Sequence, residues 1–323
     1  MSQKEIGGYF GLELNRGKEY YPDAIKLNSG RNCLKYIILA QKPSKIFMPY
    51  YIDKSMKEQS ILKMGTKLEY YHIDRNLELE REIQVHSGEK ILVNNYFSLK
   101  NDYIISLAKV YGSKLIVDNT QSFFCRNIPN IDTLYSLGSK YFGVPNGGYL
   151  FTQFKIETEF EQDFSFDKMN HLLGRLDVSA ERFYDAFKES KIYRNNQDVK
   201  KMSKITQYIL ASIDYERVRL IRERNFFYLH SFLKTINELS FDDTSIVGPM
   251  NYPFLFKHEN LRKTLINNKI YIPTYWQEII DDNETSAWEK YLSKYLLPLP
   301  IDQRYDIDDM NKILEVIRKG INK

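Results

Sequence analysis

The chain has 323 residues, of which 43% are hydrophobic and 27% are charged. These proportions are ordinary for a globular protein and exclude collagen-like, coiled-coil and wholly disordered chains, and the length allows one large domain or two smaller ones. Lys and Arg total 46 and Asp and Glu total 42, and the resulting net charge of +4 is too small and too scattered to indicate nucleic-acid binding.

Membrane, secretory and metal-binding signals are missing from the sequence. No apolar run approaches the ~20 residues of a membrane-spanning helix. The opening MSQKEIGGYF lacks the apolar core of a signal peptide. The two cysteines, Cys33 and Cys125, form no CxxC pair, and the five histidines are too widely spaced for a zinc site. We expect a soluble cytoplasmic protein with no metal centre and no membrane or nucleic-acid partner.

The first half alternates helical patterns with short β-rich runs. Pro43 ends the first helical pattern, and Gly65 and Gly112 follow the next two at the positions of C-caps. KLIVD at 114–118 is a continuous apolar run that suits a strand buried on both faces. We predict helices over 33–41, 54–64 and 102–111, and strands over 45–50, 68–73, 91–96, 114–118, 134–137 and 149–152. This alternation indicates an α/β fold with a mostly parallel central sheet flanked by helices.

The second half has a different pattern. Val218, Ile221 and Phe226 recur at helical spacing in a long run that could bridge two domains, and we interpret Arg222 beside Glu223 there as part of a solvated face. We predict helices over 202–213, 215–236 and 308–317, and strands over 253–256 and 269–272. The expected organisation is a large α/β domain over 1–220 and a smaller C-terminal α+β domain over 221–323 that includes the bridging helix.

Three features of the first half carry candidate chemistry, and the first is Ser29-Gly30-Arg31-Asn32 before a predicted helix. The free N–H groups and the dipole at a helix start favour a phosphate, and Gly30 allows close approach of a ligand. An ordinary capped helix start explains the same residues.

The second feature is Asp118 at the end of the buried strand, with Gln121 three residues later. Open α/β sheets bind ligands at the carboxyl ends of their strands, so Asp118 is placed to pair with a bound cation. An aspartate that caps the following turn is the alternative interpretation.

The third feature is Lys140 in SLGSKYFGVPNGG, at 136–148. Most lysines are solvated surface residues, and that is the alternative for Lys140. Its neighbours, however, are small, aromatic and apolar. A partly buried lysine has a lowered pKa and can act as a nucleophilic amine.

Read in order, SGRNCL, IFMPYY, VNNY, IVDNTQSFF and SLGSKYFGVPNGG resemble the fold type I pyridoxal-phosphate (PLP) enzymes. More narrowly, they resemble the DegT-like aminotransferases that act on nucleotide-linked keto-sugars. The likeness includes the opening IGGYFGLEL and the late LPLPIDQRY, so it spans most of the chain. The resemblance implies the PLP-dependent transferase fold of the aspartate aminotransferase type, PLP as cofactor and a homodimer.

The resemblance also implies roles for single residues. Lys140 would hold PLP as a Schiff base, Asp118 would pair with the protonated ring nitrogen, and Gln121 would hydrogen-bond the ring hydroxyl. PLP withdraws electrons only while that nitrogen stays protonated, which explains the need for a fixed carboxylate. The further implied cofactor contacts are the backbone amides of Gly30 and Arg31, a hydroxyl of Ser136 or Ser139, the ring of Tyr50 or Tyr51, and Asn95 at a strand end.

The sequence departs from the family pattern in several ways: the chain is shorter than many members, and Lys140 follows Ser136 by four residues, one fewer than in many relatives. Many sugar aminotransferases carry a Gly-x-Asn-x-Arg-Met segment that reaches the partner subunit's site. In the comparable stretch at 195–202, Val199 replaces the asparagine and Lys201 replaces the arginine, which leaves Asn195 or Asn196 as a guess for an amide contact. Asp53 stands where several relatives carry an aromatic residue that stacks on the cofactor ring.

The implied activity is transfer of an amino group from an amino acid, L-glutamate by family analogy, to a nucleotide-linked keto-sugar for polysaccharide synthesis. One alternative is a PLP-dependent elimination, dehydration or racemisation on the same residues. Lys140 argues against the dehydratase branch, whose members carry histidine there. Another alternative is a non-catalytic binding member of the fold, against which the joint presence of Lys140, Asp118 and Gln121 argues.

Overall fold

A computed structural model describes residues 6–53, 56, 61, 64–138, 140–195 and 197–322. The predicted helix over 54–64 lies largely outside the described residues, and Ser139 and Asn196 lie outside them too. Within the described ranges, no helix is long and apolar enough to cross a membrane.

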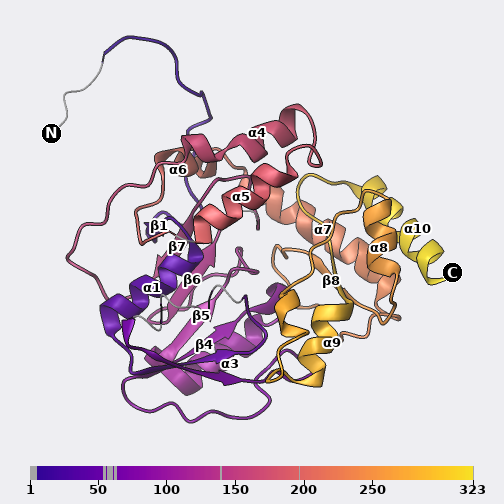
Figure 1. Ribbon diagram of the computed structural model, residues 1–323, viewed down its shortest axis with the longest axis horizontal. Coiled ribbons are helices and arrows are strands. Elements are labelled where there is room, and N and C mark those ends of the chain that lie inside the picture. Colours follow the sequence, from indigo (N-terminus) through magenta and orange to yellow (C-terminus); the bar gives the residue numbers. More distant parts are fainter. Residues whose placement is uncertain are drawn as a thin grey trace.

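A seven-stranded sheet forms the centre of the N-terminal half (Figure 1). Its strands are β1 (Ile25–Leu27), β2 (Lys45–Pro49), β3 (Lys67–Tyr71), β4 (Glu89–Asn94), β5 (Leu115–Asp118), β6 (Asp132–Ser136) and β7 (Gly148–Phe151). They lie in the order β1-β7-β6-β5-β4-β2-β3. Strands β2 to β6 pair in parallel, whereas β7 is antiparallel to both β6 and β1. The predicted mostly parallel sheet is confirmed.

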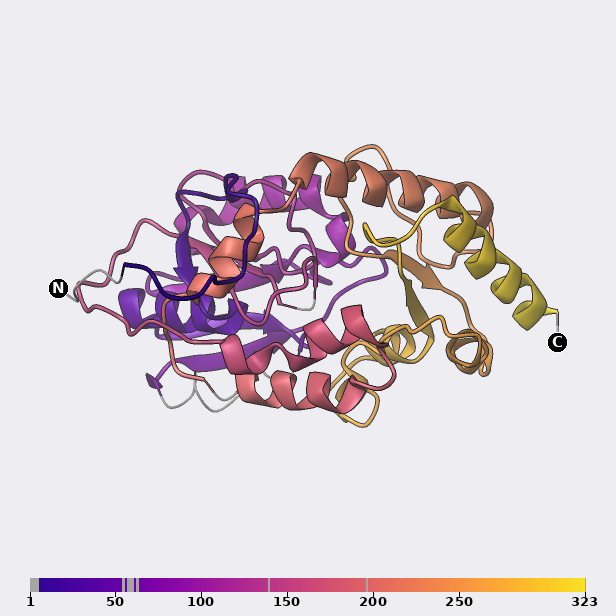
Figure 2. The same cartoon turned by 90° about the horizontal axis from the view of Figure 1, so that it is seen from above.

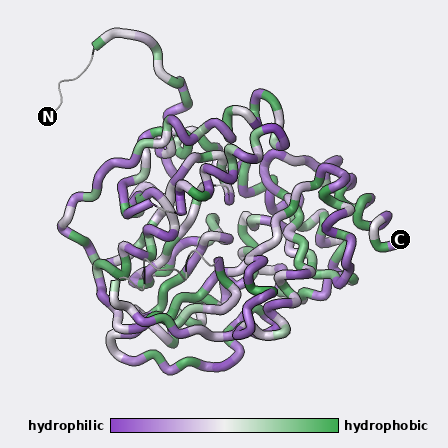
Figure 3. Tube along the Cα trace, viewed as in Figure 1, coloured by the Kyte–Doolittle hydropathy of each residue, from purple (hydrophilic) through white to green (hydrophobic). Residues whose placement is uncertain are grey.

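Helices cover both faces of this sheet. Alternate residues of β5 face opposite sides, so Ile116 packs with Ile37 of α1 (Gly30–Gln41), while Val117 packs with Leu107 of α3 (Asn101–Tyr111). Burial on both faces explains why β4 and β5 are apolar without alternation. In Figure 3 these strands are coloured largely hydrophobic, and the long outer loops hydrophilic.

The chain then leaves the sheet through a series of helices. Helices α4 (Asn170–Asp177) and α5 (Tyr184–Asn195) form a hairpin, and α6 (Lys204–Ala211) follows. The long α7 (Tyr215–Leu233) runs from the sheet toward the C-terminal elements (Figure 2). The short 3₁₀ helices are η2 (Tyr96–Ser98), η3 (Gly112–Lys114), η4 (Phe166–Lys168) and η5 (Gln277–Ile279).

The C-terminal part is a small α+β arrangement. A two-stranded antiparallel sheet joins β8 (Tyr252–Leu255) to β9 (Leu296–Leu299), and α8 (Leu261–Asn267), α9 (Ala287–Tyr295) and α10 (Ile307–Ile321) surround it. One apolar cluster includes Phe47 of β2, Phe226 of α7 and Phe254 of β8, so this part packs directly against the large sheet. The domain division at 220 stays a prediction, and it falls inside α7.

The predicted strand over 269–272 is wrong. Lys269 has φ of 62°, in the left-handed region, which ends α8 in a turn and is incompatible with an extended strand. The partner of β8 is instead β9, whose LLPL sequence directly follows α9 and gives no separate turn signal.

Candidate active site

The carboxyl ends of the parallel strands bring the predicted acidic residue to the middle of one sheet edge. Asp118 ends β5, opposite Asn94 of β4 and Leu134 of β6. Its carboxylate is buried and accepts a hydrogen bond from Thr120 N at 2.8 Å. Burial raises the pKa of Asp118, although the Thr120 hydrogen bonds and the Lys140 ammonium act in the opposite direction.

Lys140 lies in the turn after β6 and is partly buried. Its ammonium Nζ lies 6.0 Å from the centre of the Tyr275 ring, so a residue from the C-terminal part closes over it. Burial lowers the pKa of Lys140; the carboxylates of Asp53 and Asp118 oppose this shift, and the nearby cations Lys191 and Arg194 reinforce it. The structure thus places Lys140 and Asp118 within electrostatic range of each other.

The start of α1 touches the end of β6. Ser29 Oγ caps the helix by accepting from Asn32 N at 3.1 Å. A Cβ on Gly30 would lie 2.7 Å from Ser136 Cβ, and a Cβ on Gly148 would lie 2.6 Å from the Ser29 carbonyl carbon. Glycine at both positions therefore permits this close approach. It brings the N–H groups of the first helical turn beside the Ser136 hydroxyl.

A strained loop after β4 supports the neighbouring Gln121. Gln121 Oε1 accepts from Phe97 N at 3.0 Å, and Phe97 and Ser98 both have positive φ, of 57° and 62°. Such conformations cost about 1–3 kcal/mol each and persist where the surroundings fix them. The amide of Asn95 donates to Asn101 Oδ1 at 2.8 Å and Asn119 Oδ1 at 3.0 Å, so its contacts here hold the loop. A contact of Asn95 with a cofactor stays a prediction.

The two tyrosines after β2 both meet the C-terminal part. Tyr50 stacks on His72 with ring centres 4.6 Å apart and donates from its hydroxyl to Glu284 Oε2 at 3.2 Å. Burial, helped by Glu284, raises the pKa of Tyr50 to about 12. Tyr51 is fully buried, and its ring packs edge to face with Trp276, with the ring centres 4.4 Å apart. Within the described residues, its hydroxyl has no hydrogen-bond partner.

The Arg31 side chain joins α1 to α5. Its guanidinium donates from Nη1 to Asn195 O at 2.7 Å and from Nη2 to Asn195 Oδ1 at 3.0 Å. The following stretch continues along the same helix, because Asn32 Nδ2 donates to Asp198 O at 2.7 Å. The segment comparable to the cross-subunit motif of sugar aminotransferases therefore packs on its own chain's α1.

The sequence analysis missed Arg194 and Lys191, the two α5 cations that act on Lys140. They are three residues apart near the end of α5, directly before the altered 195–202 stretch. That position is the one feature of the sequence that could have identified them.

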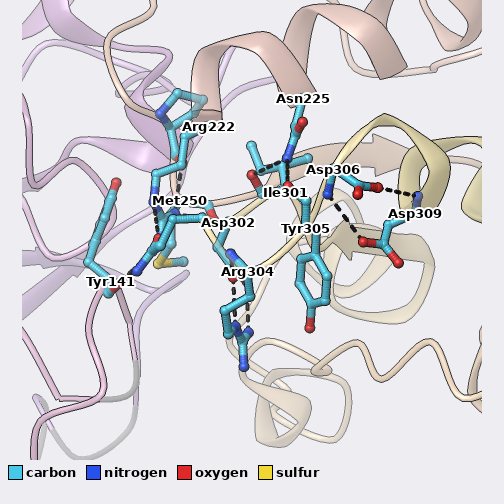
Figure 4. A network of polar contacts seen from close by, with 12 residues as sticks. Tyr141, Arg222, Asn225, Met250, Ile301, Asp302, Arg304, Tyr305, Asp306 and Asp309 are labelled. Atoms are coloured by element: carbon cyan, nitrogen blue, oxygen red, sulfur yellow. Dashed lines mark hydrogen bonds and ion pairs between the residues drawn. The ribbon is translucent and has the colours of Figure 1, made fainter. Parts of the chain in front are cut away.

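The interpretation of Arg222 as a solvated residue is wrong. Arg222 is 1% exposed and donates to the carbonyl oxygens of Pro249, Met250 and Tyr141 at 3.0–3.2 Å, as Figure 4 shows for the last two residues. Its guanidinium also lies 4.5 Å from the centre of the Tyr141 ring. The Arg-Glu-Arg sequence gave no hint of this, because only the packing of α7 decides which face is buried.

Metal ligation has no candidate in the part of the chain that the structure describes, where no group of three or more His, Cys, Asp or Glu side chains is placed to hold an ion.

Solved structures similar to this chain include aminotransferases and a dehydratase. A DegT DnrJ EryC1 StrS aminotransferase from Brucella abortus aligns with a TM-score of 0.58 at 15% identity, covering 92% of this chain and 85% of that one. A sugar aminotransferase from Micromonospora echinospora aligns with a TM-score of 0.63 at 12% identity, covering 93% and 88%. This chain has the DegT-type aminotransferase fold.

The same fold includes a dehydratase. The E coli GDP-4-keto-6-deoxy-D-mannose-3-dehydratase, solved with bound hydrated PLP, aligns with a TM-score of 0.60 at 16% identity and covers 91% of this chain and 87% of that one. No family model and no curated protein matches the sequence. The resemblance of the motifs to the PLP-dependent transferase fold is thus confirmed at the level of the fold.

Proposed function

We propose that this chain is a PLP-dependent aminotransferase that moves an amino group from L-glutamate to a nucleotide-linked keto-sugar. The meeting of Lys140 and Asp118 at the carboxyl edge of a parallel sheet, beside the start of α1, carries this proposal. Two of the similar solved structures are described as aminotransferases, which supports the proposal. A homodimer and a cytoplasmic location stay predictions.

The residues present fit PLP. The buried carboxylate of Asp118 has a raised pKa, and a protonated pyridine nitrogen beside it would stabilise its charged form. The first turn of α1, with Gly30 and Ser136 in contact, offers N–H and O–H donors to a phosphate. When bound, PLP supplies an electron-withdrawing ring that stabilises negative charge next to the reacting nitrogen.

The remaining chemistry belongs to the protein's own side chains. The lowered pKa of Lys140 increases the neutral fraction of its amine, the form that attacks a carbonyl carbon. Once released from that bond, the amine at Nζ can accept and return the proton of the substrate's Cα. The Tyr275 ring, with its centre 6.0 Å from Nζ, borders this atom on the side of the C-terminal part. Gln121, held by Phe97 N through its oxygen, presents its amide nitrogen as a donor for an acceptor on the ring.

Visible absorbance tests the cofactor and the half-reaction together. We expect the purified protein, after incubation with PLP, to show a yellow absorbance band that L-glutamate bleaches. After unbound PLP is removed, Lys140→Ala should lack the band, because the variant has lost the amine proposed to bind the aldehyde. Lys188→Ala is the matched control, since Lys188 lies on the exposed face of α5 in an ion pair with Asp185.

Two other results would redirect the proposal. A Lys140-dependent band that ignores L-glutamate and other amino donors would favour elimination, dehydration or racemisation. The absence of any band in the unmodified protein would leave a non-catalytic binding function for this fold.

A further inference from the structure

We infer that Arg194, at the end of α5, binds the phosphate of the cofactor together with the start of α1 in the same chain. This in-chain arginine would replace the contact that many sugar aminotransferases take from the partner subunit. The inference rests on the proposed function, because it concerns the same PLP site.

The first support is the position of the Arg194 side chain over the lysine loop. Nη1 donates to Pro145 O, in the loop after Lys140, at 3.3 Å and to Ser190 Oγ, one turn earlier on α5, at 3.0 Å. The Cδ atom lies 3.9 Å from where a Cβ on Gly138 would be. Gly138 lies between Ser136, which touches the start of α1, and Lys140. The Arg194 side chain therefore lies against the loop that joins Ser136 to Lys140.

The second support is the link between α5 and α1. Arg31, in the first turn of α1, donates twice to Asn195, the residue that follows Arg194. The end of α5 is thereby fixed beside the start of α1. Anions bind at helix starts, and guanidinium groups bind phosphates through paired hydrogen bonds. The start of α1 contacts Ser136, and the Arg194 side chain contacts Gly138 two residues later, so both features lie along the same loop.

The third support is the charge of this region. Burial lowers the pKa of Arg194 to about 10, and Arg194 and Lys191 both contribute to the lowered pKa of Lys140. The half-buried Arg194 and the exposed Lys191 repel the Lys140 ammonium, while the carboxylates of Asp53 and Asp118 attract it. A phosphate dianion along this loop would relieve that repulsion.

The fourth support is the altered 195–202 stretch. Val199 has no side-chain donor, and Lys201 forms an ion pair with Glu159 at 3.1 Å. Backbone bonds also tie Lys201 to residues 161 and 163 of its own chain. Neither residue therefore offers the contacts that asparagine and arginine give in the family motif, and Arg194 supplies a guanidinium from the same chain.

Binding of two ligands that differ only in the phosphate tests this inference. PLP and pyridoxal are titrated into the cofactor-free protein while intrinsic fluorescence is recorded. We expect Arg194→Ala to weaken PLP binding by about tenfold or more, since it removes a charge-assisted contact, and to leave pyridoxal binding unchanged. Arg194→Lys should recover part of the loss. Arg175→Ala, on the exposed side of α4, is the control and should change neither affinity.

Other results of the same titrations would contradict the inference. Unchanged PLP affinity in Arg194→Ala, or an equal loss for PLP and pyridoxal, would overturn the inference, the latter by showing a structural role. Thermal melting of both Arg194 variants separates unfolding from lost contact. Co-expression of Lys140→Ala with Arg194→Ala chains tests the in-chain part, because recovery of tight PLP binding would mean that Arg194 acts across subunits. If the unmodified protein binds neither ligand, the proposed function itself fails first.

Discussion

Asp118 illustrates how a residue suited to a ligand can weaken the protein that carries it. Its carboxylate is 7% exposed, and Thr120 N is its backbone hydrogen-bond donor. In the folded protein the charged form is disfavoured by burial, so its pKa is raised. The unfolded chain releases this proton more readily, and the free energy of unfolding therefore falls as pH rises from the ordinary carboxyl pKa through the raised one.

Asp118→Asn should consequently stabilise the cofactor-free protein at neutral pH, by on the order of 1 kcal/mol, because it removes the buried charge but keeps an oxygen for Thr120 N. The gain should shrink toward acid pH, where Asp118 is already neutral. Urea unfolding of the unmodified protein and of Asp118→Asn across this pH range measures the gain in free energy of unfolding. The same variant should bind PLP more weakly. A loss of stability that is independent of pH would contradict this account of Asp118.

Residues differ in how far the sequence predicts them. Asp118 ends β5 and Lys140 lies in the turn after β6, and strand ends in a parallel sheet share one edge, so the local pattern marked both as candidates while the family resemblance paired them. Arg194 and Arg222 lie on helices whose orientation depends on tertiary packing. Nothing in their immediate sequence distinguishes a buried guanidinium from a solvated one, and both were missed for that reason.

At the scale of elements, α1 is the helix on which the site depends. Its apolar face, including Leu34, Ile37 and Ile38, packs under β6 and β7, and this packing presses its first turn against the end of β6. Strands β2 to β8 and helices α1, α3, α6, α7 and α10 were predicted to within a few residues. The sequence did not predict β1, α4, α5, α8, α9 or β9, and the segment at 269–272 is a turn and loop and not the predicted strand.

Gly30→Ala tests the contact between the first turn of α1 and Ser136 at the end of β6. The added Cβ would lie 2.7 Å from Ser136 Cβ, so α1 or β6 must shift, and such overpacking costs about 1–3 kcal/mol. We expect a lower free energy of unfolding and weaker PLP binding, with pyridoxal less affected than PLP. Gly143→Ala is the control, because its Cβ would meet its nearest neighbour, Leu172, at an ordinary 3.9 Å. Equal behaviour of the two variants in denaturant and in PLP titration would refute the argument.

Across the whole molecule, Arg222 connects the parts that form the site. From α7 it reaches the loop at Pro249 and Met250, the side chain of Gln303, and the carbonyl oxygen of Tyr141, next to Lys140. Several buried acceptors depend on this one side chain. Removing it would take a donor from each of these acceptors, of which Tyr141 O keeps Gln303 Nε2 as a second donor.

Arg222→Met should therefore lower the free energy of unfolding by about 3 kcal/mol or more. We expect the PLP titration curve of this variant also to be broader, because the loop that carries Lys140 loses a hydrogen-bond donor. Denaturant unfolding measures the first effect. Arg219→Met on the same helix is the control, since its ion pairs with Glu216 and Glu223 are partly exposed and should contribute within about 1 kcal/mol. Similar losses of free energy of unfolding in both variants would show that Arg222 contributes no more to stability than the partly exposed Arg219.

The anchoring of Tyr141 has a consequence for synthesis of the chain. Its carbonyl oxygen accepts from Arg222 Nη2 at 3.2 Å and from Gln303 Nε2 at 2.8 Å. A ribosome releases Lys140 and its loop long before residue 303 emerges. The nascent chain can pair the central strands early, yet the lysine loop receives its last donor only when translation is almost finished. Products of premature termination would carry the reactive lysine but never the finished site around it.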